Sequence, residues 1–133
     1  MIAVDTSVLI DFFKGETTPG VERLQEFETE GIPFALPMIC GQELLQGARD
    51  QREWSLLHTY LSTQRLLEVS QGFLSYTEAA RIFFDCRRRG ITLRSSVDCL
   101  IAQIALEQDS TLLHDDDDFE GIAEVRPLKT LRS

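Results

Sequence analysis

The chain has 133 residues, of which 43% are hydrophobic, and this is enough for one ordinary domain with its own core. Its formal net charge is −9, from 22 acidic and 13 basic residues, a balance that argues against broad, non-specific binding to nucleic acid. No stretch approaches the roughly 20 apolar residues of a membrane span, so we expect a single domain over residues 1–133 and no membrane partner.

Short apolar runs alternate with longer amphipathic patterns along the chain. The first half predicts, in order, a strand over 2–4, a helix starting at Thr6 or Ser7 and ending before 14–15, a helix over 21–29, a strand between Pro33 and Pro37, and helices over 39–48 and 53–62. The second half predicts a strand over 66–69, a helix over 74–89, a helix capped by Ser95 or Ser96, a strand over 111–113, a helical turn over 119–123 and a strand over 125–128. This alternation predicts an α/β fold, with a parallel sheet of four or five strands flanked by helices on both faces.

Acidic residues follow the predicted strands. Asp5 comes directly after the first strand and Asp116 shortly after the fourth, and ligands of open parallel sheets bind beyond these strand ends. Asp98 lies in the first turn of its helix, where the helix dipole favours an anion, and Glu43 lies on the helix after the second strand. Taken alone, Asp98 also fits a helix-start charge and Glu43 a solvated surface residue. Asp5 interrupts apolar sequence, where an unpaired carboxylate is costly.

Several carboxylates brought together raise one another's pKa unless a cation lies among them. Mg²⁺ and Mn²⁺ prefer oxygen ligands, so a set of Asp and Glu side chains is the set expected for them. Zinc is not expected, because His58 and His114 are the only histidines and no Cys/His spacing fits. His114 adjoins the acidic run and is a candidate to support a metal ligand.

A basic cluster precedes the helix that carries Asp98. The cluster consists of Arg87, Arg88, Arg89 and Arg94. Guanidinium groups suit phosphate oxygens, so these residues are candidates for contacts with an anionic chain. The alternative is that they complement the dipole at the end of a helix.

The start of the chain and the cysteines bear on where the protein resides. The first residues lack the basic start and the cleavage site of a signal peptide, and Asp5 and Asp11 interrupt their apolar run. Cys40, Cys86 and Cys99 lie far apart, which indicates reduced thiols. We therefore expect a cytoplasmic protein.

Four segments resemble, in order, the motifs of one protein family. PIN domains, particularly the toxins of the VapBC toxin–antitoxin type, open with a motif similar to AVDTSVLIDFF. The family's second acidic motif is similar to PMICGQELLQGA, its third to SSVDCLIAQIAL, and its closing D-x-D-F motif to LLHDDDDFEGIA. No single motif is specific, but the four together cover nearly the entire chain.

The resemblance implies a metal-dependent endoribonuclease that hydrolyses phosphodiester bonds with water activated by Mg²⁺ or Mn²⁺. The family's catalytic acids then fall on Asp5, Glu43, Asp98 and Asp116. The metal would be held by Asp5, Asp98 and Asp116, with Asp118 as a further candidate ligand.

The resemblance also assigns supporting positions. Thr6 or Ser7 would support Asp5 through a hydroxyl hydrogen bond. His114 stands where the family often has Thr or Ser, and Asp115 and Asp117 add charge to the last motif. Arg87, Arg88, Arg89 and Arg94 become candidate RNA contacts.

The partners implied are an RNA substrate, a cognate VapB-like antitoxin and a second copy of the chain. The exposed face of helices 21–29 and 53–62, with Trp54 and Tyr60, is a candidate contact surface, unless these aromatics are core. Two alternatives stay open. One is a PIN-like module that binds RNA or a partner without cutting. The other is a phosphoacceptor signalling domain, against which stands the lack of an Asp directly after the predicted strand 66–69.

Overall fold

A parallel five-stranded sheet lies at the centre of the structure, a computed structural model that describes residues 1–133. Its strands are β1 (Ile2–Val4), β2 (Phe34–Pro37), β3 (Leu66–Leu67), β4 (Thr111–His114) and β5 (Lys129–Arg132). They are arranged in the order β3-β2-β1-β4-β5, and every neighbouring pair is parallel. The carboxyl ends of all five strands therefore meet at one edge of the sheet.

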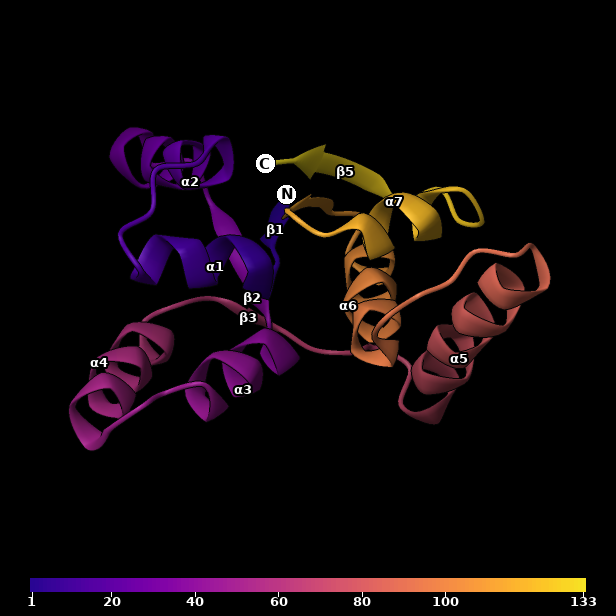
Figure 1. Ribbon diagram of the computed structural model, residues 1–133, viewed down its shortest axis with the longest axis horizontal. Coiled ribbons are helices and arrows are strands. Elements are labelled where there is room, and N and C mark those ends of the chain that lie inside the picture. The colour runs from indigo at the N-terminus through magenta and orange to yellow at the C-terminus, as the bar shows by residue number, and fades with distance from the viewer.

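Helices cover both faces of this sheet, as the alternating pattern predicts. They are α1 (Thr6–Phe13), α2 (Pro19–Glu30), α3 (Met38–Gln46), α4 (Gln51–Ser62), α5 (Phe73–Arg88), α6 (Ser96–Glu107) and α7 (Asp117–Ala123). Figure 1 shows α1 to α4 on one side of the strands and α5 to α7 on the other. None of these helices has the length and apolar character needed to cross a membrane.

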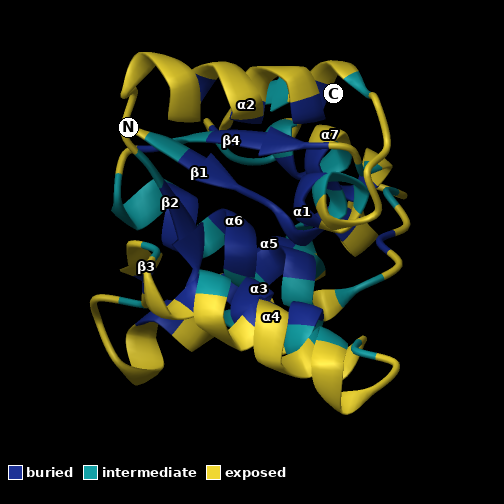
Figure 2. Cartoon of the chain, turned by 90° about the vertical axis from the view of Figure 1, so that its left-hand side faces the viewer, coloured by how far each residue is buried: buried dark blue, intermediate teal, exposed yellow.

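The core forms where the strands meet the inner faces of the helices. Beyond its first, partly buried residue, each of the three central strands is buried, and Ala3, Leu36 and Leu113 are fully buried. On α6, Ile101 and Ile104 are fully buried as well. Figure 2 shows most of β1, β2 and β4 in the buried colour and the outer faces of α2 and α4 in the exposed colour. The sheet edge is thus held by a rigid, close-packed interior.

Two carboxylates begin helices at this edge. Asp5 follows β1 and caps α1, with its Oδ2 accepting the N–H of Ser7 at 3.0 Å. Asp116 follows β4 and caps α7, with its Oδ1 accepting the N–H of Asp118 at 2.9 Å. A short side-chain acceptor at a helix start satisfies an N–H group that lacks a helical partner. The strand-to-helix junctions therefore fix both acids locally.

The strand predicted at residues 125–128 is wrong, because β5 lies at Lys129–Arg132. Pro127 has no N–H to donate to a sheet, and the N–H of Leu128 is used locally by the carbonyl oxygen of Arg126 at 2.8 Å. The true strand lies at the edge of the sheet and is only half-buried, so its sequence is mixed rather than apolar. The third strand, β3, is also shorter than predicted.

Candidate active site

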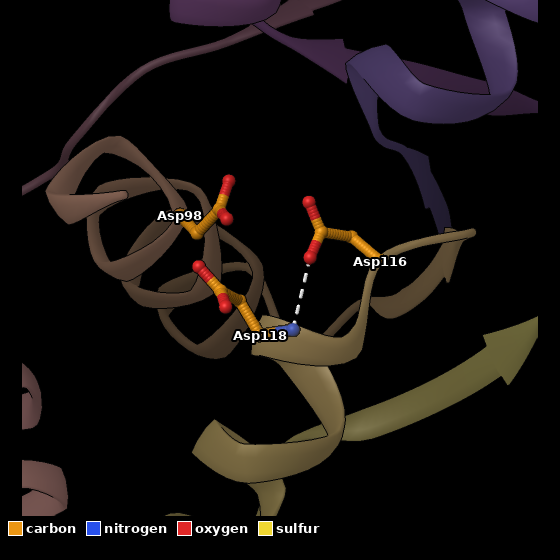
Figure 3. Close-up of side chains that lie close together, drawn as sticks. All are labelled: Asp98, Asp116 and Asp118. Carbon is orange, nitrogen blue, oxygen red and sulfur yellow. Dashed lines mark hydrogen bonds between the residues drawn. The ribbon is translucent and has the colours of Figure 1, made fainter. Parts of the chain in front are cut away.

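Three aspartates gather at the carboxyl edge of the sheet (Figure 3). Asp98 comes from the first turn of α6, and Asp116 and Asp118 come from the start of α7. One carboxylate oxygen from each lies within 4.8 Å of the others. Figure 3 shows the three side chains pointing toward a common space between the two helices. This spacing allows them to share one cation.

Asp5 and Glu43 join the same electrostatic environment. Asp5 is only 3% exposed, at the end of β1. The charge of Glu43 contributes to raising the pKa of Asp5, and the charge of Asp5 contributes to raising the pKa of Asp98. The structure therefore brings the acids predicted from the sequence to one edge of the sheet.

Hydroxyl groups of α1 hold these two carboxylates. Ser7 donates its hydroxyl to Asp5 Oδ2 at 2.6 Å, whereas Thr6 donates its hydroxyl to Glu43 Oε1 at 2.8 Å. The expected support of Asp5 is thus confirmed for Ser7, and Thr6 holds a different acid. In each case one oxygen is fixed by a hydrogen bond. Oδ1 of Asp5 is buried and has no hydrogen-bond partner.

The pKa values of Asp98 and Asp5 are raised, because their charged forms are disfavoured at this edge of the sheet. Burial raises the pKa of Asp98 to about 9, helped by its contact with Asp118 and by the charges of Asp5 and Asp116. Burial also raises the pKa of Asp5 to about 6, although hydrogen bonds from Ser7 oppose the shift. A cation placed among these groups would favour their charged forms.

The donor set fits a hard divalent cation. It consists of carboxylate oxygens, and the unpartnered Oδ1 of Asp5 is a ready ligand atom. Cys40 lies close to Asp5, but burial raises the pKa of its thiol well above the usual range, so it stays neutral.

His114 supports the backbone before Asp116. Its ring is fully buried, Nδ1 accepts the N–H of Asp116 at 3.1 Å, and Nε2 lies 2.9 Å from Glu120 Oε1. Because Nδ1 accepts, the proton of the neutral ring is on Nε2 and is donated to Glu120. Burial lowers the pKa of His114, which keeps this form. The residue therefore orients the turn that presents Asp116.

The predicted basic cluster is divided in space. Only Arg94 reaches the acids, with Nη2 3.1 Å from Asp116 Oδ1 and Nε 3.9 Å from Asp118 Oδ1. Arg89 donates from Nη1 to the carbonyl oxygen of Glu124 at 2.8 Å, at the opposite end of α7.

Arg87 and Arg88 lie over aromatic rings of their own helix. Their guanidinium carbons are 5.8 Å from the ring centre of Phe83 and 5.6 Å from that of Phe84, respectively. A small pocket of about 190 Å³ lies beside Arg87 and extends along the turn after α5 toward Leu93, the neighbour of Arg94. The helix end is therefore an exposed basic surface outside the group of acids.

The sequence pattern did not reveal Arg132, the last residue of β5. Its Nη2 lies 2.7 Å from Asp117 Oδ1, and its Nε lies 3.9 Å from Asp115 Oδ1. It therefore pairs with the two acids of the run that lie outside the cluster. Correct placement of β5 was the only signal that could have identified it, since the register sets Arg132 beside His114.

An apolar groove of about 460 Å³ runs between α3 and α4. Trp54, which is 44% exposed, lines this groove. Met38, Leu45 and Leu66 also line it. Tyr60, predicted to share this surface, instead packs its ring 4.9 Å from that of Phe13 and 6.2 Å from that of Phe12. The contact face predicted over helices 21–29 and 53–62 is wrong as one surface, because α2 packs against α1 and α4 against α3, and Figure 2 shows α2 and α4 at opposite ends of the molecule. The groove around Trp54 is the part of it that α4 exposes.

Comparison with known proteins gives concordant results. Residues 2–125 match the PIN domain family. The chain is 32% identical over 130 residues to the VapC ribonuclease Mb1587 of Mycobacterium bovis and to Ribonuclease VapC11 of Mycobacterium tuberculosis, covering 97% of this chain and 96% of each relative.

Solved structures share the fold at lower sequence identity. VapBC2 of Rickettsia felis, bound to a DNA fragment from its promoter, has a TM-score of 0.77 at 17% identity, covering 100% of this chain and 99% of that one. DNA-bound VapBC of Salmonella typhimurium has a TM-score of 0.75 at 15% identity, covering 98% of this chain and 96% of that one.

We expect Asp98→Asn to stabilise the metal-free protein. The folded-state pKa of Asp98, about 9, lies above its ordinary value of 3.8, so its ionisation destabilises the fold. The penalty is absent below the ordinary value and grows as the pH rises toward the folded value. The melting temperature in EDTA should therefore rise by several degrees at about pH 8 and change little at about pH 4.

Glu107→Gln on the same helix is the matched control. Burial opposes ionisation there, but hydrogen bonds from Gln103 and Ser70 together lower the pKa of Glu107 to about 2. This variant should lower the melting temperature at neutral pH. An Asp98→Asn protein that melts at or below the parent's temperature across this pH range would contradict the prediction.

Proposed function

The chain belongs to the PIN domain family, and from this premise we propose that it is a metal-dependent endoribonuclease, the toxin of a type II toxin–antitoxin system. The observation that carries the proposal is the group formed by the carboxylates of Asp98, Asp116 and Asp118 at the carboxyl edge of the sheet, with the buried, unpartnered Oδ1 of Asp5 at the end of β1 on the same edge. The relatives named as VapC ribonucleases align with nearly the whole chain. The chemistry of the site and the names of the relatives therefore agree.

The reaction is hydrolysis of a phosphodiester bond with water as the nucleophile. Bound Mg²⁺ or Mn²⁺ supplies positive charge that lowers the pKa of water and offsets charge on the phosphate and on the leaving 3′ oxygen. Asp5, Asp98 and Asp116 would hold this ion, each through an oxygen that no N–H group occupies. Glu43 would take part directly or through a water molecule, oriented by the hydroxyl of Thr6. No side-chain nucleophile is required.

Arginines would bind the RNA backbone on two sides of this site. The side chain of Arg94 is 71% exposed, so it can exchange the carboxylate of Asp116 for a phosphate oxygen of the substrate. Arg87 and Arg88 are exposed, and their guanidinium groups make no ion pair with a carboxylate. In a chain of net charge −9, such unpaired cations at the end of α5 favour contact with a polyanion.

The antitoxin would dock in the groove between α3 and α4. Similar solved structures are VapBC toxin–antitoxin complexes, and the groove exposes Trp54 and Met38 without a covering element. The same helix α3 carries Glu43, which does not line the groove and is held by Thr6 of α1. The homodimer implied by the resemblance stays a prediction.

The alternatives considered from the sequence now differ in weight. Membership of the PIN family removes the basis for a phosphoacceptor domain. A PIN-like module without cleavage activity is separated from the enzyme only by experiment. The support that His114 gives to Asp116 favours the enzyme, because the altered last motif still presents its acid to the cluster.

We expect Asp5→Asn to abolish RNA cleavage that depends on Mg²⁺ or Mn²⁺. The amide removes a negative ligand at the end of β1, so the rate on labelled single-stranded RNA should fall at least about a hundredfold. Asp11→Asn on the same helix is the control and should cleave like the parent. Cleavage that survives EDTA would indicate a contaminant. Metal-dependent cleavage that survives Asp5→Asn would contradict the role of Asp5, and a parent without activity would favour the non-cutting module.

The double variant Arg87→Ala, Arg88→Ala should weaken RNA binding in EDTA, where no cleavage occurs. Each lost phosphate contact should reduce the slope of log affinity against log salt by about 0.7. Arg49→Ala on the opposite side of the sheet is the control, because its guanidinium already pairs with Glu53. A salt titration that gives the parent's slope for the double variant would remove these residues from the RNA path.

Trp54→Ala should weaken binding of the antitoxin, for which the probe is the small protein encoded by the neighbouring reading frame. An aromatic anchor in a groove typically contributes enough for a loss of at least about tenfold in affinity. Mn²⁺ binding should not change. Phe73→Ala is the control, since Phe73 is 83% exposed on α5, across the sheet. If Phe73→Ala weakens the complex and Trp54→Ala does not, the partner covers the other face.

A further inference from the structure

Asp118 is held differently from the other acids of the site. Its Oδ2 accepts two backbone N–H groups, from Arg94 at 2.9 Å and from Ser95 at 3.1 Å. The side chain is only 3% exposed. These two donors lie more than 20 residues away in sequence, in the segment that leads into α6. The carboxylate therefore ties the start of α7 to the start of α6.

The other carboxylates are fixed by short-range backbone contacts, by hydroxyl groups or, for Asp116, also by the exposed guanidinium of Arg94, whose Nη2 lies 3.1 Å from Oδ1. Asp5 is bound by Ser7, two residues away, and Asp116 accepts the N–H of Asp118, also two residues away. Glu43 accepts a hydroxyl hydrogen bond from Thr6. Of these acids, only Asp118 receives backbone N–H groups of a distant segment.

These two hydrogen bonds hold the start of α6, the helix turn that carries Asp98. Ser95 caps α6 through its hydroxyl, which accepts the N–H of Val97 at 3.2 Å, and Asp98 follows within the same turn. Asp98 is 8% exposed, and one of its oxygens lies within 4.8 Å of oxygens of Asp116 and Asp118. Its position therefore depends on where the start of α6 is held.

We propose that Asp118 is a positioning residue, which anchors the start of α6 through two backbone hydrogen bonds and thereby holds Asp98 beside Asp116, and that its charge is dispensable for metal binding. The inference rests on the proposed function, because it concerns the same metal site. It removes Asp118 from the set of required ligands and leaves Asp5, Asp98 and Asp116 in that role.

A neutral acceptor separates anchoring from ligation. The two N–H groups need an oxygen with lone pairs, which the amide of asparagine also offers. A metal ligand of this type contributes its negative charge, which asparagine lacks. Asp118→Asn should therefore keep the anchor, whereas Asp118→Ala loses both the anchor and the charge.

The affinity for Mn²⁺ alone, measured by electron paramagnetic resonance without RNA, tests the proposal. Asp118→Asn should bind Mn²⁺ within about threefold of the parent, and Asp118→Ala at least about tenfold more weakly, the usual scale for groups that orient metal ligands. Amide hydrogen exchange at residues 94 and 95 gives a second readout. These amides should stay protected in Asp118→Asn and exchange fast in Asp118→Ala.

Two further variants complete the design. Arg94→Ala removes the guanidinium and its ion pairs with Asp116 and Asp118 but keeps the backbone N–H, so it should leave the exchange protection of residues 94 and 95 intact. Asp98→Asn should lose Mn²⁺ binding. If Asp98→Asn binds Mn²⁺ like the parent, the metal site itself is wrong, while amide exchange still tests the anchor.

The proposal is overturned if folded Asp118→Asn loses Mn²⁺ as Asp98→Asn does, because Asp118 is then a ligand. It is also overturned if Asp118→Ala keeps full affinity or full amide protection. The result for Asp118→Asn decides the matter even where Asp118→Ala fails to fold.

Discussion

Repulsion among buried carboxylates is the constraint on which the rest of this structure depends. Three of them place oxygens within 4.8 Å of one another at the edge of the sheet. Two like charges about 4 Å apart repel by roughly 4 kcal/mol at an effective dielectric constant of about 20. Three such pairs rival the net stability of a domain, about 5–15 kcal/mol. The high pKa of Asp98 expresses the same conflict, which either a proton or a cation must relieve.

The helix N-termini offset only part of the repulsion between these carboxylates. Asp5 and Asp116 cap α1 and α7, and Asp98 and Asp118 lie in the first turns of α6 and α7. A charge at a helix N-terminus gains about 0.3–1 kcal/mol, less than a single repulsive pair at this distance. The caps therefore orient the acids without neutralising them. A site built in this way is preorganised for a cation and costly without one.

Local signals made the acids predictable from the sequence. Each of Asp5 and Asp116 follows an apolar strand and precedes a helix, and the order of elements alone brings such junctions to one edge. Long-range partners carry no such signal. The bond from Thr6 to Glu43 depends on how α1 packs against α3. Similarly, α5 ends at Arg88, and the turn at Gly90, with φ of +77°, separates the arginines before it from Arg94.

The position of β5 decides how much charge the acidic run brings to the site. Asp116 and Asp118 enter the cluster, whereas Asp115 and Asp117 pair with Arg132. The N–H of Asp115 also donates to the hydroxyl of the same serine that holds Asp5. In the observed register Arg132 lies beside the last residue of β4. A strand at residues 125–128, as the apolar pattern predicts, would set Leu128 there and leave two more carboxylates without a cation. The exposed ion pairs of Arg132 contribute little to stability. They nevertheless hold Asp115 and Asp117 away from the cluster of Asp98, Asp116 and Asp118, where further negative charge would add to the repulsion.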